Sequence, residues 1–230
     1  MIGKKEKSVY YYGYNNNQNA DKSVFQKAWE VYNKYGLSEL IRKVYNLSRH
    51  KLTYLSHKLY YETLNRYFVL DGKKYHYFIN RYNALNSERA VEIPFTIEFL
   101  KQNQYKQKRV LEVGNVLSHY FDFDHKIVDK YEKENFVDNI DIIDFSPKEK
   151  YQIIISVSTI EHVGFDEPIK EVGKSKKAIQ KIISLLDRGG IALITVPLRY
   201  NPEIDSIIQN KEIKFSKTYF LKRYSNFNLW

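Results

Sequence analysis

A short apolar run that ends in a carboxylate and a glycine is the part of this sequence best suited to chemistry. It reads Val-Leu-Glu-Val-Gly-Asn from Val110 to Asn115. Ligands of open α/β folds bind where the first strand ends and the chain turns. Gly114 permits a positive φ or a close approach of backbone to ligand, and Glu112 offers a carboxylate to a cationic or hydroxylated group. The spacing predicts a nucleotide-type site; the alternative is a buried strand that ends in an ordinary glycine turn.

Histidines with acid–base potential follow the ends of other apolar runs. His162 comes after the run at residues 151–157, and His119 follows the glycine turn. We predict His162 as the general base, with His119 as a second candidate. The competing interpretation of the Glu161-His162 pair is structural, with the histidine hydrogen-bonded to backbone. The remaining histidines lack metal-ligand spacing, so we predict no metal site.

The elements that position these residues alternate from residue 109 onward. Strands are predicted at Val110–Val113, Lys126–Asp129, Ile140–Ile143, Tyr151–Val157 and Ile191–Val196, with a helix over residues 174–186 and a turn at residues 187–190. The β-branched run at residues 151–157 is typical of a strand buried on both faces, as in a parallel sheet. The predicted fold is therefore α/β, a Rossmann-like, mostly parallel sheet flanked by helices.

The first part of the chain predicts an α-rich cap. Helices are expected from Asp21 or Ser23 to Tyr35, from Ser38 through Leu47, over residues 52–64 and from Pro94 to Leu100, with a β-hairpin at residues 67–78 turning at Asp71-Gly72. Residues 1–20 are polar and predict a loop or tail. We place the boundary near residue 105, with a basic, Tyr-rich cap over 1–105 and a Rossmann-like domain over 106–230.

Strand-like segments close the chain. Residues 217–224 predict an antiparallel strand, and Asn228–Trp230 resembles the start of the next one. Two interpretations of this strand pair stay open: a truncated chain or an incomplete sheet. An incomplete sheet exposes an edge, which makes a homo-oligomer a possible assembly.

Charge is concentrated in the predicted cap. Residues 1–108 hold 19 Lys and Arg against 9 Asp and Glu, a net of +10, whereas residues 109–230 hold 18 of each. Three interpretations stay open: a lid that binds an acidic or carbohydrate acceptor, a nucleic-acid surface, or a solvated helical surface whose tyrosines pack the core. There are no cysteines, no signal peptide and no long apolar segment, so we expect a cytoplasmic protein without a transmembrane helix.

The ordered set of motifs resembles the class I S-adenosylmethionine-dependent methyltransferases, in their small-molecule branch. The likeness rests on Val110–Gly114, Asp129, Asp141, Ser156–Val163 and Leu186–Gly190, and covers about residues 109–200. The stretches Glu88–Pro94 and Asn115–Tyr120 are similar to a poorly characterised subgroup. The resemblance implies S-adenosyl-L-methionine as cofactor and a small-molecule or glycan-type acceptor, methylated by in-line displacement.

Site roles follow from this resemblance. It places the methionine part at Gly114 and Asn115 with Glu112 nearby, the ribose hydroxyls at Asp129, and the adenine at Asp141 and Ile142. Tyr120, Tyr200 and Asn201 follow predicted strand ends on the ligand side, and together with Arg89 they are the predicted acceptor-binding residues. A solvated strand-end acid is the other interpretation of Asp129, and Glu132 is the alternative residue for its role.

The sequence departs from the family at its glycine-rich loop. Val116 and Ser118 stand where glycines are common, and no G-x-G-x-x-G motif marks a dinucleotide dehydrogenase. The alternatives to a small-molecule methyltransferase are a nucleic-acid-binding protein or RNA methyltransferase using the basic region, and a non-catalytic Rossmann-like binding module.

Overall fold

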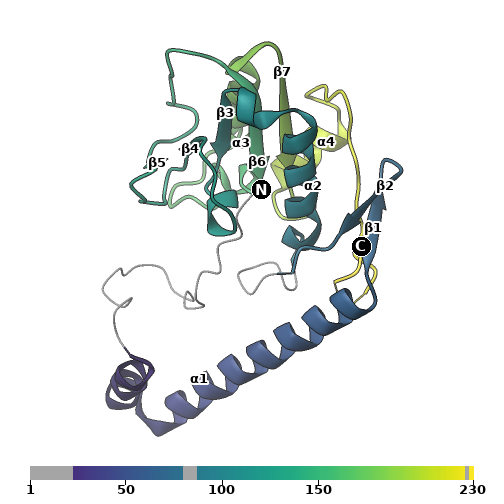
Figure 1. The fold of residues 1–230 in the computed structure, drawn as a ribbon. Coiled ribbons are helices and arrows are strands. Elements are labelled where there is room, and N and C mark those ends of the chain that lie inside the picture. The colour runs from purple at the N-terminus through teal and green to yellow at the C-terminus, as the bar shows by residue number, and fades with distance from the viewer. Residues whose placement is uncertain (1–22, 80–86, 226–227) are drawn as a thin grey trace.

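A five-stranded parallel sheet forms the centre of the protein. The computed structural model describes residues 23–79, 87–225 and 228–230 (Figure 1). The sheet has the order β5-β4-β3-β6-β7 and comprises β3 (Val110–Val113), β4 (Lys126–Val128), β5 (Val137–Asp138), β6 (Tyr151–Val157) and β7 (Leu186–Thr195). All four strand pairs are parallel. The predicted α/β, Rossmann-like fold class is confirmed.

Helices cover the two faces of this sheet. Along β6, Ile153, Ile155 and Val157 pack on one face against α2 (Arg89–Gln102), while Ile154 lies on the other. That second face is covered by α3 (Lys174–Ser184) and α4 (Pro202–Gln209). Because successive side chains of a strand point to opposite faces, a strand that is covered on both faces needs an unbroken run of apolar residues.

The connections on the β5 side of the sheet contain no α-helix. Residues 114–150 are all described, and the only helix among them is the short 3-10 helix η3 (Leu117–His119). Two further 3-10 helices are η2 (Tyr105–Gln107), before β3, and η4 (Ile160–His162), after β6. The loops that follow β3 and β5 are held by apolar side chains that pack in the two cores of the sheet, and by polar contacts of their own.

Two predictions for the sheet need correction. The third strand lies at Val137–Asp138, and the predicted residues 140–143 instead run into a turn over residues 142–144. Ile142 is buried from that turn, whereas Ile140 is exposed and Ile143 is half-buried, so the apolar run does not form a strand. The predicted turn at residues 187–190 is a bulge inside β7, because pairing passes from Tyr151–Leu186 to Ile153–Ile191.

A long bent helix, α1 (Val24–Thr63), precedes the sheet and extends away from it (Figure 1). Ser23 caps it with a reciprocal capping box to Gln26, as the Ser23 start predicts. Gly36 has φ 83°, so the helix is kinked at the residue predicted to end it. Beyond Gly36 the two predicted helices form one continuous segment. The expected loop or tail over residues 1–20 lies outside the described residues.

The predicted hairpin forms and is tied to α2 through a proline. Strands β1 (Tyr67–Leu70) and β2 (Lys73–His76) pair around Asp71 and Gly72, both with positive φ. α2 begins at Arg89, not at the predicted Pro94, which lies inside it. Because Pro94 has no N–H, the Ala90 carbonyl lacks its usual helical partner. That carbonyl accepts a hydrogen bond from the Phe78 N–H at 2.9 Å instead.

The C-terminal segment contains no strand among its described residues. The prediction for residues 217–224 is therefore wrong, and the last residues pack on the hairpin instead. Tyr77 Oη donates to the Trp230 carbonyl at 3.1 Å and accepts from the Trp230 N–H at 2.9 Å. None of the helices that the structure describes is long and apolar enough to cross a membrane.

Candidate active site

The loop after β3 is held from behind by Glu112. This side chain is fully buried, and its Oε1 accepts from the N–H groups of Val116 at 2.9 Å and Leu117 at 2.7 Å. Its Oε2 lies 2.7 Å from Nε2 of His125. The structure thus places Glu112 at the predicted strand end with both oxygens bonded within the chain.

Gly114 is required by a neighbouring loop. It has φ 87°, and a Cβ at this position would lie 2.1 Å from Oγ1 of Thr159. Its own N–H donates to the Val128 carbonyl at 2.8 Å, while the Asn115 N–H donates to Asp129 at 3.0 Å. The amides of Gly114 through Leu117 are therefore all used by the chain itself. The turn brings the loops after β3 and β6 into direct contact.

Asp129 organises the loop after β4. One carboxylate oxygen accepts from Asn115, and the other accepts from the backbone N–H groups of Tyr131 and Glu132, each at 2.8 Å. Glu132 lies 3.2 Å from Nε2 of His119. Asp129 and His119 therefore share one edge of the site, as the strand ends predict. Each Asp129 oxygen accepts up to two hydrogen bonds, so acceptor capacity remains.

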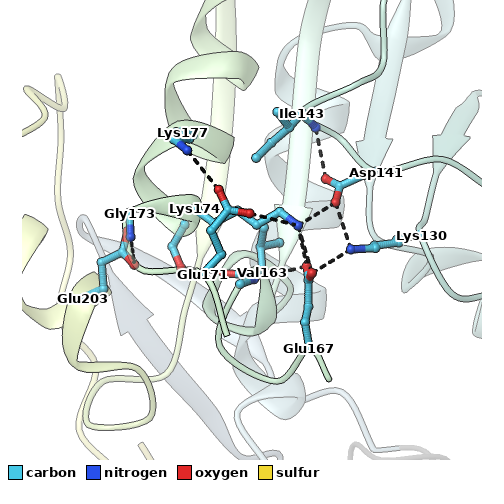
Figure 2. A network of polar contacts seen from close by, with 12 residues as sticks. Lys130, Asp141, Ile143, Val163, Glu167, Glu171, Gly173, Lys174, Lys177 and Glu203 are labelled. Atoms are coloured by element: carbon cyan, nitrogen blue, oxygen red, sulfur yellow. Dashed lines mark hydrogen bonds and ion pairs between the residues drawn. The ribbon is translucent and has the colours of Figure 1, made fainter. Parts of the chain in front are cut away.

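Asp141 belongs to a network of ion pairs that joins three loops (Figure 2). Its carboxylate lies 3.0 Å from Nζ of Lys130 and 2.9 Å from Nζ of Lys174. Glu167 completes the network at 2.7 Å from Lys130 and 2.8 Å from Lys174. Three of the four side chains are about nine-tenths buried. The network crosses the place where the sequence predicts the adenine amino group.

The pKa values in this network all move toward the charged forms. Burial alone would raise the pKa of Asp141 and Glu167, but hydrogen bonds from the two lysines hold it below the usual range. Burial would likewise lower the pKa of Lys130 and Lys174, and their carboxylate partners raise it instead. The network is therefore fully ionised at neutral pH and neutral as a whole.

Three of the predicted ligand contacts lie inside the protein. Ile142 is 4 % exposed and packs in the core with Val128 and Ile160, and Tyr120 is 2 % exposed and contacts Phe78 edge to face. Asn201 caps α4, accepting from the Glu203 N–H at 2.9 Å, and its amide donates to the Glu161 carbonyl at 2.7 Å. The structure does not bring these side chains together with His162.

Two buried carboxyl groups, Glu92 and Glu161, lie beside the end of β6, and sequence reasoning gave neither of them a role in the site. Ser158 has φ 41°, and its hydroxyl is 2.8 Å from both oxygens of Glu92 on α2. Arg89, one turn earlier, donates to the carbonyls of Val157 at 3.3 Å and Ser158 at 3.5 Å. The sequence signal for Glu92 was a carboxylate inside the otherwise apolar run Ala-Val-Glu-Ile. The strained Ser158 backbone is typical of a functional site.

Burial sets the protonation of both carboxyl groups. It raises the pKa of Glu92 to about 7, against the opposing effects of Arg89 and the Ser158 hydroxyl. It raises the pKa of Glu161, which is 1 % exposed, to about 8, and the nearby Glu92 adds to this rise. Perturbed pairs of this kind are enriched at active sites.

His162 lies at the open side of this cluster. Its Nδ1 is hydrogen-bonded to Asp166, and Tyr200 Oη donates to the same carboxylate at 2.6 Å. Because a carboxylate only accepts, Nδ1 carries the proton of this hydrogen bond. Burial alone would raise the pKa of Asp166, but the hydrogen bonds from His162 and Tyr200 outweigh it and lower that pKa. The Asp166 carboxylate in turn raises the pKa of Tyr200 to about 12. The structure thus brings the predicted His162 and Tyr200 together through Asp166.

Two buried polar atoms at this edge have no partner. They are Nδ2 of Asn115, after β3, and Oε2 of Glu161, after β6. Their residues are 4 % and 1 % exposed. An orphaned buried donor or acceptor costs about 1–3 kcal/mol, so a ligand that satisfies both recovers that cost. This edge of the sheet therefore offers one unpartnered donor and one unpartnered acceptor to a ligand.

No group of three or more potential metal ligands occurs among the described residues. No protein-family model matches the chain, and no curated protein matches it. Among solved structures the chain matches the crystal structure of the N-methyltransferase NodS from Bradyrhizobium japonicum WM9 in complex with S-adenosyl-L-homocysteine. The two share 15% sequence identity with a TM-score of 0.28, over 48% of this chain and 67% of that one. The fold class defined above rests on the strand order of this chain.

Proposed function

We propose that this protein binds S-adenosylmethionine and transfers its methyl group to a small-molecule or sugar-containing acceptor. The observation that carries the proposal is the pair of orphaned buried groups, Asn115 Nδ2 and Glu161 Oε2. They follow β3 and β6, the two neighbouring strands from which the chain continues in opposite directions across the sheet. Ligands of open α/β sheets bind at such a switch point.

Each residue has a defined part in this proposal. Asn115 donates to the carboxylate of the methionine part, and Glu161, which releases its proton to solvent when the ammonium group binds beside it, accepts from that group. Asp129 uses its remaining acceptor capacity for the ribose hydroxyls. Glu112 and Gly114 fix the conformation of the loop after β3 through contacts within the chain. The bound cofactor supplies a sulfonium methyl group that is already activated for displacement.

His162 acts as general base in the proposed reaction. Asp166 fixes the ring through Nδ1, and the acceptor proton moves to Nε2. The His162 side chain is 48% exposed, which leaves access for an acceptor. The predicted cap contributes Arg89 and Glu92 from α2, so acceptor binding and the N-terminal region meet at the end of β6. Orientation of the two reactants provides the larger part of the rate enhancement.

Calorimetric titration with S-adenosylhomocysteine tests the cofactor assignment. We expect binding to the full chain, weakened about tenfold or more in Asn115→Ala because one charge-assisted hydrogen bond is lost. The matched control is Asn210→Ala, whose amide bonds to Ser206 on the surface of α4 and which should bind as the unmodified chain does. Equal affinity of all three proteins would contradict the role of Asn115.

A second candidate function is a non-catalytic Rossmann-like binding module. It is favoured by the loop amides of residues 114–117, which are all bonded within the chain, and by the ion pairs of Asp141 with two lysines. A folded protein that does not bind S-adenosylmethionine or S-adenosylhomocysteine would select this candidate. Oligonucleotide binding with a steep salt dependence would select the nucleic-acid alternative.

A further inference from the structure

An apolar stripe, interrupted at Ser48, runs along α1 beyond Gly36. Its members recur at helical spacing and each is 46–67% exposed; they are Leu37, Ile41, Val44, Tyr45, Leu52, Leu55 and Leu59. On an α-helix this spacing places them within about 100° of one another, which is the width of a face that normally packs on a core. Here the stripe extends over six turns of helix and faces water.

The helix contacts the rest of the described structure only near its end. His57 and Tyr61 are buried, and Tyr61 packs in the cluster formed with the hairpin. All side chains of residues 41–49 are exposed, and Figure 1 shows α1 as an arm that leaves the sheet region. Helices in proteins owe most of their stability to packing of the apolar face. An uncovered stripe of this length therefore indicates a binding surface.

Positive charges lie on both sides of the stripe. Arg42 and Arg49 border one side, and Lys51 and Lys58 border the other. The acidic side chains beyond Gly36 are Glu39, which pairs with Arg42 at 2.8 Å, and Glu62, which lies 3.9 Å from Lys58. A second copy packed on this stripe, parallel or antiparallel, would place cation against cation. The flanks therefore favour an anionic partner.

Large aromatic side chains are exposed on the part of α1 before the kink. Phe25 is 87% exposed, Trp29 is 64%, and Tyr32 and Tyr35 are 43% and 54%. An apolar face of Leu and aromatic residues with Lys and Arg beside it is the pattern of helices that lie in a membrane interface. Phosphate contacts alone would leave the leucines uncovered, which disfavours a nucleic acid.

We propose that α1 docks on the surface of an anionic lipid bilayer, lying in its plane with the Leu37–Leu59 stripe in the acyl boundary. The segment beyond Gly36 is about 40 Å long, which exceeds the ~30 Å diameter of a small domain. Arg42, Arg49, Lys51 and Lys58 then meet the anionic headgroups. This inference goes beyond the proposed methyl transfer and does not depend on it.

Vesicle flotation with the full chain tests the proposal. We expect binding to vesicles of phosphatidylcholine mixed with phosphatidylserine and much weaker binding to phosphatidylcholine alone. The double variant I41N/L52N should lose binding without any change of charge. R42Q/R49Q should lose affinity by about fivefold for each charge removed. The matched control N46S alters an exposed polar residue on the opposite side of the helix and should bind normally.

Three results would overturn the proposal. The first is no flotation of a protein whose circular dichroism shows an intact fold. The second is a dimer in sedimentation velocity without lipid that I41N/L52N converts to monomer, since this would assign the stripe to a second copy. The third is oligonucleotide binding that R42Q/R49Q abolishes and I41N/L52N leaves intact.

Discussion

Replacing Gly114 by alanine tests whether the fold requires glycine at this position or whether ligand binding requires it. The backbone there has φ 87°, and the new Cβ would lie 2.1 Å from Oγ1 and 2.5 Å from Cγ2 of Thr159. Real Cβ atoms do not approach that closely, so one of the two loops must move. The substitution therefore combines backbone strain with overpacking between the loops after β3 and β6.

The two contributions are separated by a matched control. Gly173 has φ 86°, nearly the same value, and a Cβ there has no heavy atom within 4 Å. A left-handed backbone costs an L-residue roughly 1–2 kcal/mol, and overpacking adds about 1–3 kcal/mol. We expect Gly173→Ala to lower the free energy of unfolding by about 1–2 kcal/mol and Gly114→Ala by about 2–5 kcal/mol. For a chain of this size each kcal/mol shifts Tm by about 2–4 °C.

Urea unfolding followed by circular dichroism measures both values. The combination Gly114→Ala with Thr159→Gly removes the blocking atoms, so the double variant should be more stable than the sum of the single effects by about 1–3 kcal/mol. Equal losses in Gly114→Ala and Gly173→Ala, or strict additivity in the double variant, would refute the packing role. The glycine would then serve the ligand, as the sequence pattern alone suggests.

Two further predictions concern ionised groups. The folded Glu161 carboxyl keeps its proton up to about pH 8, whereas the unfolded one releases it near 4.5. The folded state thus binds more protons in between, so stability falls as pH rises through this window, by up to about 1.4 kcal/mol per pH unit. Glu161→Gln should flatten this slope, measured by urea unfolding at about pH 5 and about pH 7, and an unchanged slope would disprove the assignment. In the ion-pair network, Lys174→Met leaves Asp141 and Glu167 with one cation and should cost roughly 3 kcal/mol. Lys177→Met, at the exposed pair with Glu171, should cost less than about 1 kcal/mol; similar losses in both variants would contradict the importance of burial.

Local sequence signals predicted the elements whose cause is local. The Asp71-Gly72 turn fixes the hairpin, and Ser23 with Gln26 fixes the start of α1. The apolar run of β6 predicted its burial on both faces. By contrast, α4 was missed although Asn201-Pro202 is a helix-start signature, with Asn201 as N-cap and proline in the first turn.

Two of the wrong element predictions have different causes. Ile142 was expected on a strand but reaches the core from a turn, and the cause is local, because the Asp141 side chain accepts from the Ile143 N–H at 3.1 Å. Pro94 was expected at a helix start, and only the Phe78 contact explains how it sits inside α2. No local pattern indicates such a partner.

The candidate site was predictable in part for the same reason. The predicted strand ends place the loops of Gly114, Asp129 and His162 at one edge of the sheet, because the carboxyl ends of parallel strands lie on the same side. Glu92 comes from a helix before the sheet, and its proximity to Ser158 depends on how α2 packs. Sequence order alone contains no information about that contact.

The ion-pair network has a consequence for how the protein responds to acid. Lys130 follows β4, Asp141 follows β5, Glu167 follows β6 and Lys174 is the first residue of α3, so four side chains join three loops to the start of a helix. The same region is also held by apolar contacts, because Val128 and Ile142 pack in one core with α3 and α4. Acid that protonates Asp141 and Glu167 removes the ion pairs between these loops and leaves the apolar contacts beneath them in place.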